Sequence, residues 1–181
     1  MRRIVLLTGA SGVGKTSVFW RTVKCLKAKG LEIRGILCQD LCESGKRVGL
    51  EMMDISNGEK AWLARINYPG VHKVSNYTVN LLDLDVLGAS AIFDALHSGD
   101  VIAIDEIGPM ELSSTAFSAA LVQAIETSKP LLATVRHDIG HPLVESIKAR
   151  SDAELIQVTP ENRKKLHVEV AEKLMSCLVL A

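Results

Sequence analysis

The feature that constrains the fold most is a glycine-rich segment near the N-terminus, residues 9–16, which read GASGVGKT. The spacing G-x-x-x-x-G-K-T is that of a Walker A P-loop, and the apolar run at residues 3–7 predicts the strand from which such a loop emerges. Residues 17–29 follow with helical periodicity. A chance glycine-rich turn does not account for a strand before it and a helix after it, so the segment predicts a P-loop fold.

The residue types in this loop suit a bound polyphosphate. Glycines allow backbone conformations in which successive N–H groups point at an anion, and the helix N-terminus faces the same way. Lys15 supplies a positive charge for the β- and γ-phosphates, and the Thr16 hydroxyl is a suitable ligand for Mg²⁺. The predicted nucleotide-binding residues are Gly9, Ala10, Ser11, Gly12, Val13, Gly14, Lys15, Thr16 and Ser17.

A second half of the site is predicted where the apolar run Val101–Ile104 ends in Asp105 and Glu106. An acid at the carboxyl end of a buried parallel strand lies in the crevice where open α/β sheets bind ligands. Asp105 fits the Walker B role and is predicted, with Thr16, to hold Mg²⁺ as the cofactor. Glu106 is predicted to orient the attacking water and accept its proton, with Lys15 as the second catalytic residue. The plainer interpretation is that both acids only end the strand.

With these motifs together, the chain resembles the THEP-type nucleoside-triphosphatase family, also called the cancer-related nucleoside-triphosphatase family. The main segment is residues 101–112, VIAIDEIGPMEL, together with the P-loop. Weaker matches lie at residues 45–49, 73–81, 132–134 and 158–163. The family pattern DEIGKMEL has Lys where Pro109 stands here, so a phosphate-neutralising role of that lysine would be lost or pass to another cation.

The resemblance implies a RecA-like P-loop fold with a mixed sheet and Mg²⁺-dependent hydrolysis of ATP, GTP, CTP and UTP to the diphosphate and phosphate. It also implies little base selectivity. The sequence agrees, because residues 162–165 read NRKK and lack the acid of the guanine-reading Asn-Lys-x-Asp motif. Two alternatives stay open. A small-molecule or nucleoside kinase needs an acceptor pocket, and a nucleotide-binding adaptor would show negligible intrinsic hydrolysis.

Composition sets the broader class of protein. The 181 residues are 48% hydrophobic but only 4% aromatic, which predicts an aliphatic core of a sheet covered by helices. Lys+Arg and Asp+Glu balance at 21 each, so a large nucleic-acid or membrane surface is not indicated. There is no long apolar run or signal-like segment, and we expect a cytoplasmic monomer with reduced cysteines.

The pattern along the chain predicts one α/β domain, residues 1–181, with a mainly parallel central sheet and an antiparallel β-rich insertion at about 32–80. Helices or strands are expected in the order strand 3–7, helix 17–29, strands 32–39, 47–55, 60–66 and 77–80, helix 83–96, strand 101–104, helix 113–128, strand 131–135, helix 142–150, strand 154–158 and a C-terminal helix that begins at residues 159–161. Residues 110–112 are expected to lead into the helix that follows.

Further candidates are weaker. Phosphoryl transfer spreads negative charge that an arginine can hold. The candidates, in which a structural ion pair is the plainer interpretation, are Arg47, Arg65, Arg136 and Arg163. Arg136 ranks first because it follows the strand at 131–135. His137 and His141 could suggest a metal site, but Gly140 and Pro142 favour a loop.

Overall fold

The first strand shows how the sequence builds two cores. The strand β1 (Ile4–Thr8) is buried along its whole length, and successive side chains point to opposite faces. Ile4 and Leu6 join one hydrophobic cluster, whereas Val5 and Leu7 join the other. A strand that is apolar on both faces must be covered on both faces, as parallel strands of α/β proteins are.

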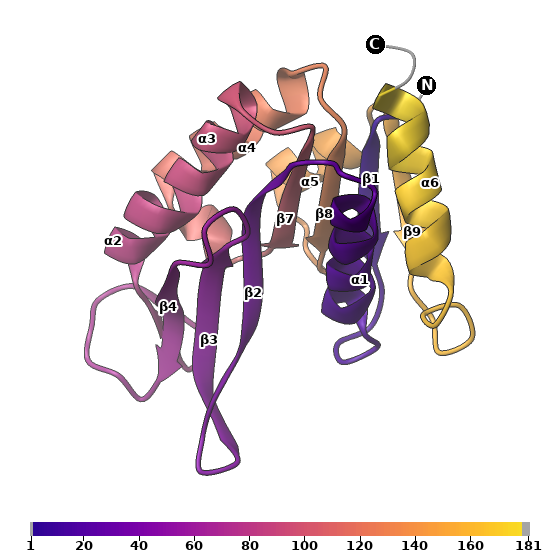
Figure 1. Ribbon diagram of the computed structural model, residues 1–181. Helices are drawn as coiled ribbons and strands as arrows, with labels where there is room; N and C mark the ends of the chain where they lie inside the picture. Colours follow the sequence, from indigo (N-terminus) through magenta and orange to yellow (C-terminus); the bar gives the residue numbers. More distant parts are fainter. Residues whose placement is uncertain (1, 179–181) are drawn as a thin grey trace.

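The computed structural model describes residues 2–178, and nine strands of this part form a single mixed sheet in the order β5-β6-β4-β3-β2-β7-β8-β1-β9 (Figure 1). The remaining strands are β2 (Ile33–Glu43), β3 (Lys46–Asp54), β4 (Lys60–Ile66), β5 (Lys73–Val74), β6 (Tyr77–Val79), β7 (Val101–Ile107), β8 (Leu131–Val135) and β9 (Ala153–Gln157). In this order, the five strands from β2 to the β9 edge pair in parallel, and the five strands from β2 to the β5 edge pair in antiparallel fashion. The predicted α/β fold with an antiparallel extension is confirmed.

Helices cover the two faces of the parallel part. They are α1 (Lys15–Ala28), α2 (Leu81–Asp83), η1 (Leu84–Ala89, a π-helical segment), α3 (Ser90–His97), η2 (Glu111–Ser113, a 3₁₀ turn), α4 (Thr115–Glu126), α5 (Pro142–Lys148) and α6 (Leu166–Leu178). Helices α1 and α6 pack on one face, and α3, α4 and α5 pack on the other (Figure 1). No helix in residues 2–178 combines the length and the apolar character that crossing a membrane requires.

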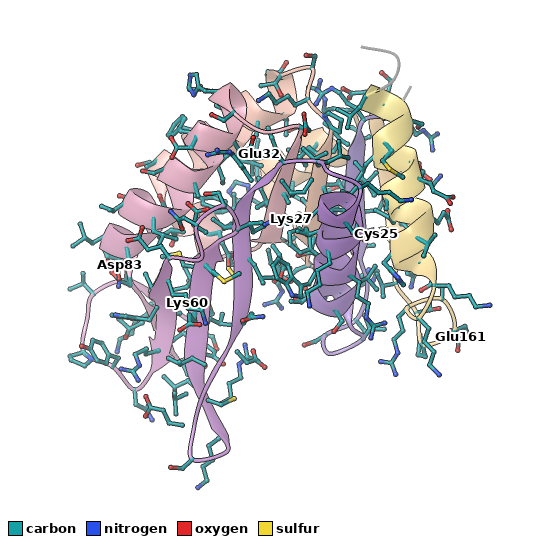
Figure 2. The ribbon with its side chains drawn as sticks, in the orientation of Figure 1. Cys25, Lys27, Glu32, Lys60, Asp83 and Glu161 are labelled. Carbon is teal, nitrogen blue, oxygen red and sulfur yellow. The ribbon has the colours of Figure 1, made fainter. Side chains whose placement is uncertain are left out.

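The strand β2 connects the parallel part to the antiparallel extension. Residues 33–37 pair with β7, and residues 36–43 pair with β3. Gly35 permits this close pairing, because it has φ +127° and a Cβ there would lie 2.0 Å from the carbonyl oxygen of Ala103. Helix α1 also holds the end of β3: its Lys27, labelled in Figure 2, donates from Nζ to the carbonyl oxygen of Ile55 (2.8 Å). The hairpin of β2 and β3 then projects beyond the helices (Figure 1).

Several predicted boundaries were wrong, and one short strand was not predicted. The strand expected at 101–104 continues to Ile107, so it contains the acids that were expected to follow it. The last helix begins at Leu166, not at residues 159–161. The preceding turn is held by Thr159 and Asn162, whose side chains each accept the other's backbone N–H (3.3 and 2.8 Å). The two-residue strand β5 was not predicted, because so short a segment carries no periodicity.

Candidate functional site

The glycine-rich loop lies at the carboxyl end of β1 and encloses its lysine. Lys15 is the first residue of α1, and its Nζ donates to the carbonyl oxygens of Gly9 (3.2 Å) and Ala10 (3.4 Å). Gly9 has φ +143°, and a Cβ at this position would lie 2.7 Å from the carbonyl oxygen of Val158, so only glycine fits. The loop thus wraps around one cation at the start of α1, a position that suits a polyphosphate.

A cavity of about 990 Å³ opens in front of this loop. All but one of the predicted nucleotide-binding residues line it, together with both predicted acids. The exception is Val13, whose side chain packs toward the core of α1 and α6 and whose carbonyl oxygen accepts a hydrogen bond from Arg163 Nη1 (3.1 Å). The topology therefore brings together two segments about ninety residues apart in sequence, residues 9–17 and 105–106.

Asp105 is fully buried in β7 at the base of the cavity. Its Oδ1 accepts hydrogen bonds from the hydroxyls of Thr16 (3.3 Å) and Thr134. Its Oδ2 is buried and has no hydrogen-bond partner among the described residues. Burial raises the pKa of Asp105 from 3.8 to about 7, although the two hydroxyls lower it. A buried carboxylate oxygen without a partner, next to a threonine hydroxyl, fits the hard oxygen ligands that Mg²⁺ prefers.

Glu106 is the next residue of the strand and lines the same cavity, partly exposed. Burial raises its pKa, whereas the positive charges of Lys15, Arg136 and Arg47 lower it. This carboxylate therefore lies within electrostatic reach of cations from three separate elements. Such a position suits a group that must hold a negative charge beside a phosphate.

A third carboxylate, Glu111 in η2, is buried at 4% exposure and also borders the cavity. Gly108 lies between it and Glu106: a Cβ built there would be 2.9 Å from Glu111 Oε2 and 3.2 Å from Glu106 Oε1. Burial, together with the charges of the neighbouring carboxylates, raises the pKa of Glu111 from 4.5 to about 8. Two of the three acids thus converge on one glycine of the turn after β7.

The candidate arginines are distributed unequally. Arg136 and Arg47 line the cavity, and each is paired with an exposed carboxylate, Asp138 and Asp40 respectively, at 3.1 Å. Arg163 instead borders a separate hollow of about 220 Å³, with Gly14, Ser17, Arg21 and Lys164. Arg65 borders neither space and pairs with Glu43.

The cysteines and histidines give no second site. All four cysteines are free, as predicted. Cys38 borders the cavity, and burial raises the pKa of its thiol well above the ordinary value, so the thiol stays protonated. The Nδ1 of His141 accepts the backbone N–H of Leu143 and caps α5. Within residues 2–178, no group of His, Cys, Asp and Glu side chains is clustered as a metal site of three or more such ligands.

Comparison with known proteins matches this arrangement. The sequence profile of the family described as NTPase matches residues 4–171. The chain belongs to this family. Among curated members, the nucleoside-triphosphatase THEP1 of Thermofilum pendens is 34% identical over 172 residues, which are 94% of each chain. The protein of the same name from Methanocaldococcus jannaschii is 35% identical over 174 residues, 96% of this chain and 98% of that one.

Solved structures of the NTPase family share the fold. The crystal structure of THEP1 from Aquifex aeolicus superposes with a TM-score of 0.85 and 28% identity, covering 94% of this chain and 98% of that one. The solution structure of a human cancer-related nucleoside triphosphatase gives a TM-score of 0.82 and 33% identity, covering 96% and 98%. The resemblance found from the motifs is therefore confirmed.

Three features of the site were not predicted from the sequence. Residues 110–112 were expected only to lead into a helix, but Glu111 turns back under the cavity. An acid between the apolar residues Met110 and Leu112 was the available signal. Thr134 carries no motif of its own, and its bond to Asp105 follows from the adjacency of β7 and β8. The third feature is the side of the cavity formed by the antiparallel extension.

Proposed function

We propose that this chain is an Mg²⁺-dependent nucleoside triphosphatase that converts ATP, GTP and other nucleoside triphosphates to the diphosphate and phosphate with low base selectivity. One observation carries the proposal: the P-loop threonine is hydrogen-bonded to a buried carboxylate, and the second oxygen of that carboxylate has no partner in the described chain. This pair supplies two of the oxygen ligands that a metal would need, and Lys15, the residue before Thr16, supplies a cation for a triphosphate. The names of the curated relatives support the nucleoside-triphosphatase part of this proposal.

Each residue then has a role that follows from its position. Backbone N–H groups of the glycine-rich loop and the Lys15 ammonium bind the phosphates. Thr16 and Asp105 would hold Mg²⁺, which supplies charge neutralisation at the phosphate oxygens. Glu106, at the edge of the same cavity, positions a water molecule and accepts its proton as the water oxygen bonds to the γ-phosphorus and the bond to the diphosphate breaks. Arg136, which lines the same cavity, supplies further positive charge.

Low base selectivity is supported by the second hollow. It adjoins the helix start at Gly14 and Ser17, where the nucleoside would leave the phosphates. The side chains that border it are the long cations of Arg21, Arg163 and Lys164. Long cationic side chains of this kind carry only donors, which can meet acceptor atoms of any base, and they do not form the pattern of donors and acceptors that distinguishes one base from another.

The test is phosphate release from ATP, GTP, CTP and UTP with Mg²⁺, measured for the unaltered protein and for Glu106→Gln. We expect release from all four nucleotides and a decrease of about 10²- to 10⁴-fold in the variant, because a general base of this kind contributes that much. Nucleotide binding should survive. Glu145→Gln is the control, since that glutamate is exposed and pairs with Lys148 on α5.

Two results would overturn the proposal. If both proteins bind nucleotide and neither releases phosphate, hydrolysis is not an intrinsic activity, and the adaptor alternative is favoured. If only one nucleotide is hydrolysed, the proposed selectivity is wrong even though the chemistry is right.

A further inference from the structure

The cavity is larger on one side than the phosphate-binding loop accounts for. Its volume of about 990 Å³ lies at the upper end of the range for small-molecule sites, about 300–1,000 Å³. One wall is the loop, and the other belongs to the antiparallel extension. The extension contributes Gln39 and Asp40 from β2, Arg47 and Leu50 from β3, Val74 from β5 and Tyr77 from β6. None of these residues belongs to a phosphate-binding motif.

This second wall combines an apolar surface with one cation. Val74 and Tyr77 are directly paired across β5 and β6, so their side chains share a face of the sheet. Leu50, Val74 and Tyr77 are each only partly buried against the core and keep surface toward the cavity. The Arg47 guanidinium lies 5.7 Å from the centre of the Tyr77 ring, within cation–π range.

The charges of the wall specify what it can hold. Arg47 is the one cation that the extension gives to the cavity lining, and Asp40 lies 3.1 Å from it. A polyphosphate would meet too little positive charge here and a nearby carboxylate, whereas a single phosphate fits one guanidinium fork. Asp40 and Gln39 supply acceptors for the N–H or O–H groups of a ring or sugar.

We propose that this wall is a second small-molecule site, which binds a nucleoside monophosphate by its single phosphate at Arg47 and by its ring against Tyr77, Leu50 and Val74, while a nucleoside triphosphate occupies the P-loop. The two ligands would share one continuous cavity and meet near Glu106. The site goes beyond the proposed hydrolysis and requires only that the loop binds a triphosphate.

The chain contains a matched control for the pair Arg47–Tyr77. Arg65 lies 5.8 Å from the ring centre of Tyr68 and pairs with Glu43, so it has the same chemistry on the same extension. Neither Arg65 nor Tyr68 lines the cavity. The two pairs therefore differ in access to the cavity and not in kind.

The experiment is calorimetric titration with AMP, GMP, CMP and UMP, in the absence and in the presence of Mg²⁺ and a saturating β,γ-imido analogue of ATP. We expect saturable binding of at least one monophosphate with one molecule per chain, retained when the analogue fills the loop. Arg47→Ala and Tyr77→Leu should each weaken it about tenfold or more, as expected for a charge-assisted contact and a lost ring contact. Arg65→Ala and Tyr68→Leu should change it less than about twofold.

Arg47 has a side-chain exposure of 46%, so its replacement leaves the core intact, and thermal unfolding of all four variants verifies this. The proposal is overturned if none of the four monophosphates binds saturably, if the analogue displaces the bound monophosphate, or if the two pairs of variants weaken binding equally. Phosphate release is not the readout, so a failure of the hydrolase proposal would be seen separately.

Discussion

Replacing Glu111 by glutamine should make the stability of the protein less dependent on pH. Burial raises the pKa of this carboxyl from 4.5 to about 8, so the folded chain keeps the proton up to about pH 8, whereas the unfolded chain releases it near pH 4.5. Stability should therefore fall as pH rises through this window. Compared with a side chain that is always neutral, Glu111 lowers the free energy of unfolding by about 4 kcal/mol at pH 8 and by about 1 to 2 kcal/mol at pH 5.5.

Glu111→Gln removes this penalty and adds a buried amide that has to find a partner, at a cost of about 1–3 kcal/mol that does not change with pH. The informative quantity is thus the difference between variant and unaltered protein, compared at the two pH values. We expect the variant to gain about 3 kcal/mol relative to the unaltered protein between pH 5.5 and pH 8. Urea unfolding with linear extrapolation measures each free energy.

The matched control is Glu126→Gln at the end of α4, where the carboxylate has a side-chain exposure of 63% and pairs with Arg150 on the surface. The difference in unfolding free energy between Glu126→Gln and the unaltered protein should be nearly the same at both pH values. A Glu111→Gln difference that is equally independent of pH would show that burial does not hold the proton on Glu111 in the folded state, and the reasoning above would be refuted.

Two further substitutions test how the acids are positioned. Gly108→Ala places a methyl group 2.9 Å from Glu111 Oε2 and 3.2 Å from Glu106 Oε1, so we expect phosphate release to fall about tenfold with nucleotide binding retained; equal losses of both would indicate a general folding defect. Thr134→Val removes a hydroxyl that Asp105 accepts from, and Mg²⁺ titration of phosphate release should show a metal requirement raised about 10- to 100-fold, whereas Thr134→Ser should restore it.

The parts of the fold that the sequence predicts well are those in which local pattern and tertiary environment agree. The P-loop needs glycine at fixed positions for steric reasons, so its spacing alone indicates its structure; at Gly9, for example, a Cβ would lie only 2.7 Å from the carbonyl oxygen of Val158. Likewise, an apolar run without alternation, such as Val101–Ile104, is typical of a strand buried on both faces. In both cases the side chains carry the signal that the surroundings require.

Prediction was less successful where side-chain hydrogen bonds decide whether a segment forms a helix start or a turn. Residues 159–161 carry a cap, a proline and an acid, which is a good helix start. The reciprocal bonds of Thr159 and Asn162 instead hold a turn, from which Arg163 reaches back to the P-loop at Val13, and the helix begins at Leu166. That contact spans 150 positions in the sequence and leaves no local pattern.

The chemistry of the site depends on the same long-range placement. Asp105 lies near the charge of Lys15 and accepts a hydrogen bond from the hydroxyl of Thr134, because β7 lies beside β8, and β8 lies beside β1. The opposite wall comes from strands that extend the sheet beyond β2, and Tyr77 on β6 is placed at the cavity by three successive antiparallel pairings, β2 with β3, β3 with β4 and β4 with β6. Sequence motifs identify the wall formed by the P-loop, because the binding of phosphate by backbone groups imposes one geometry on the chain. The facing wall has no such requirement, and its role follows only from which side chains the sheet places there.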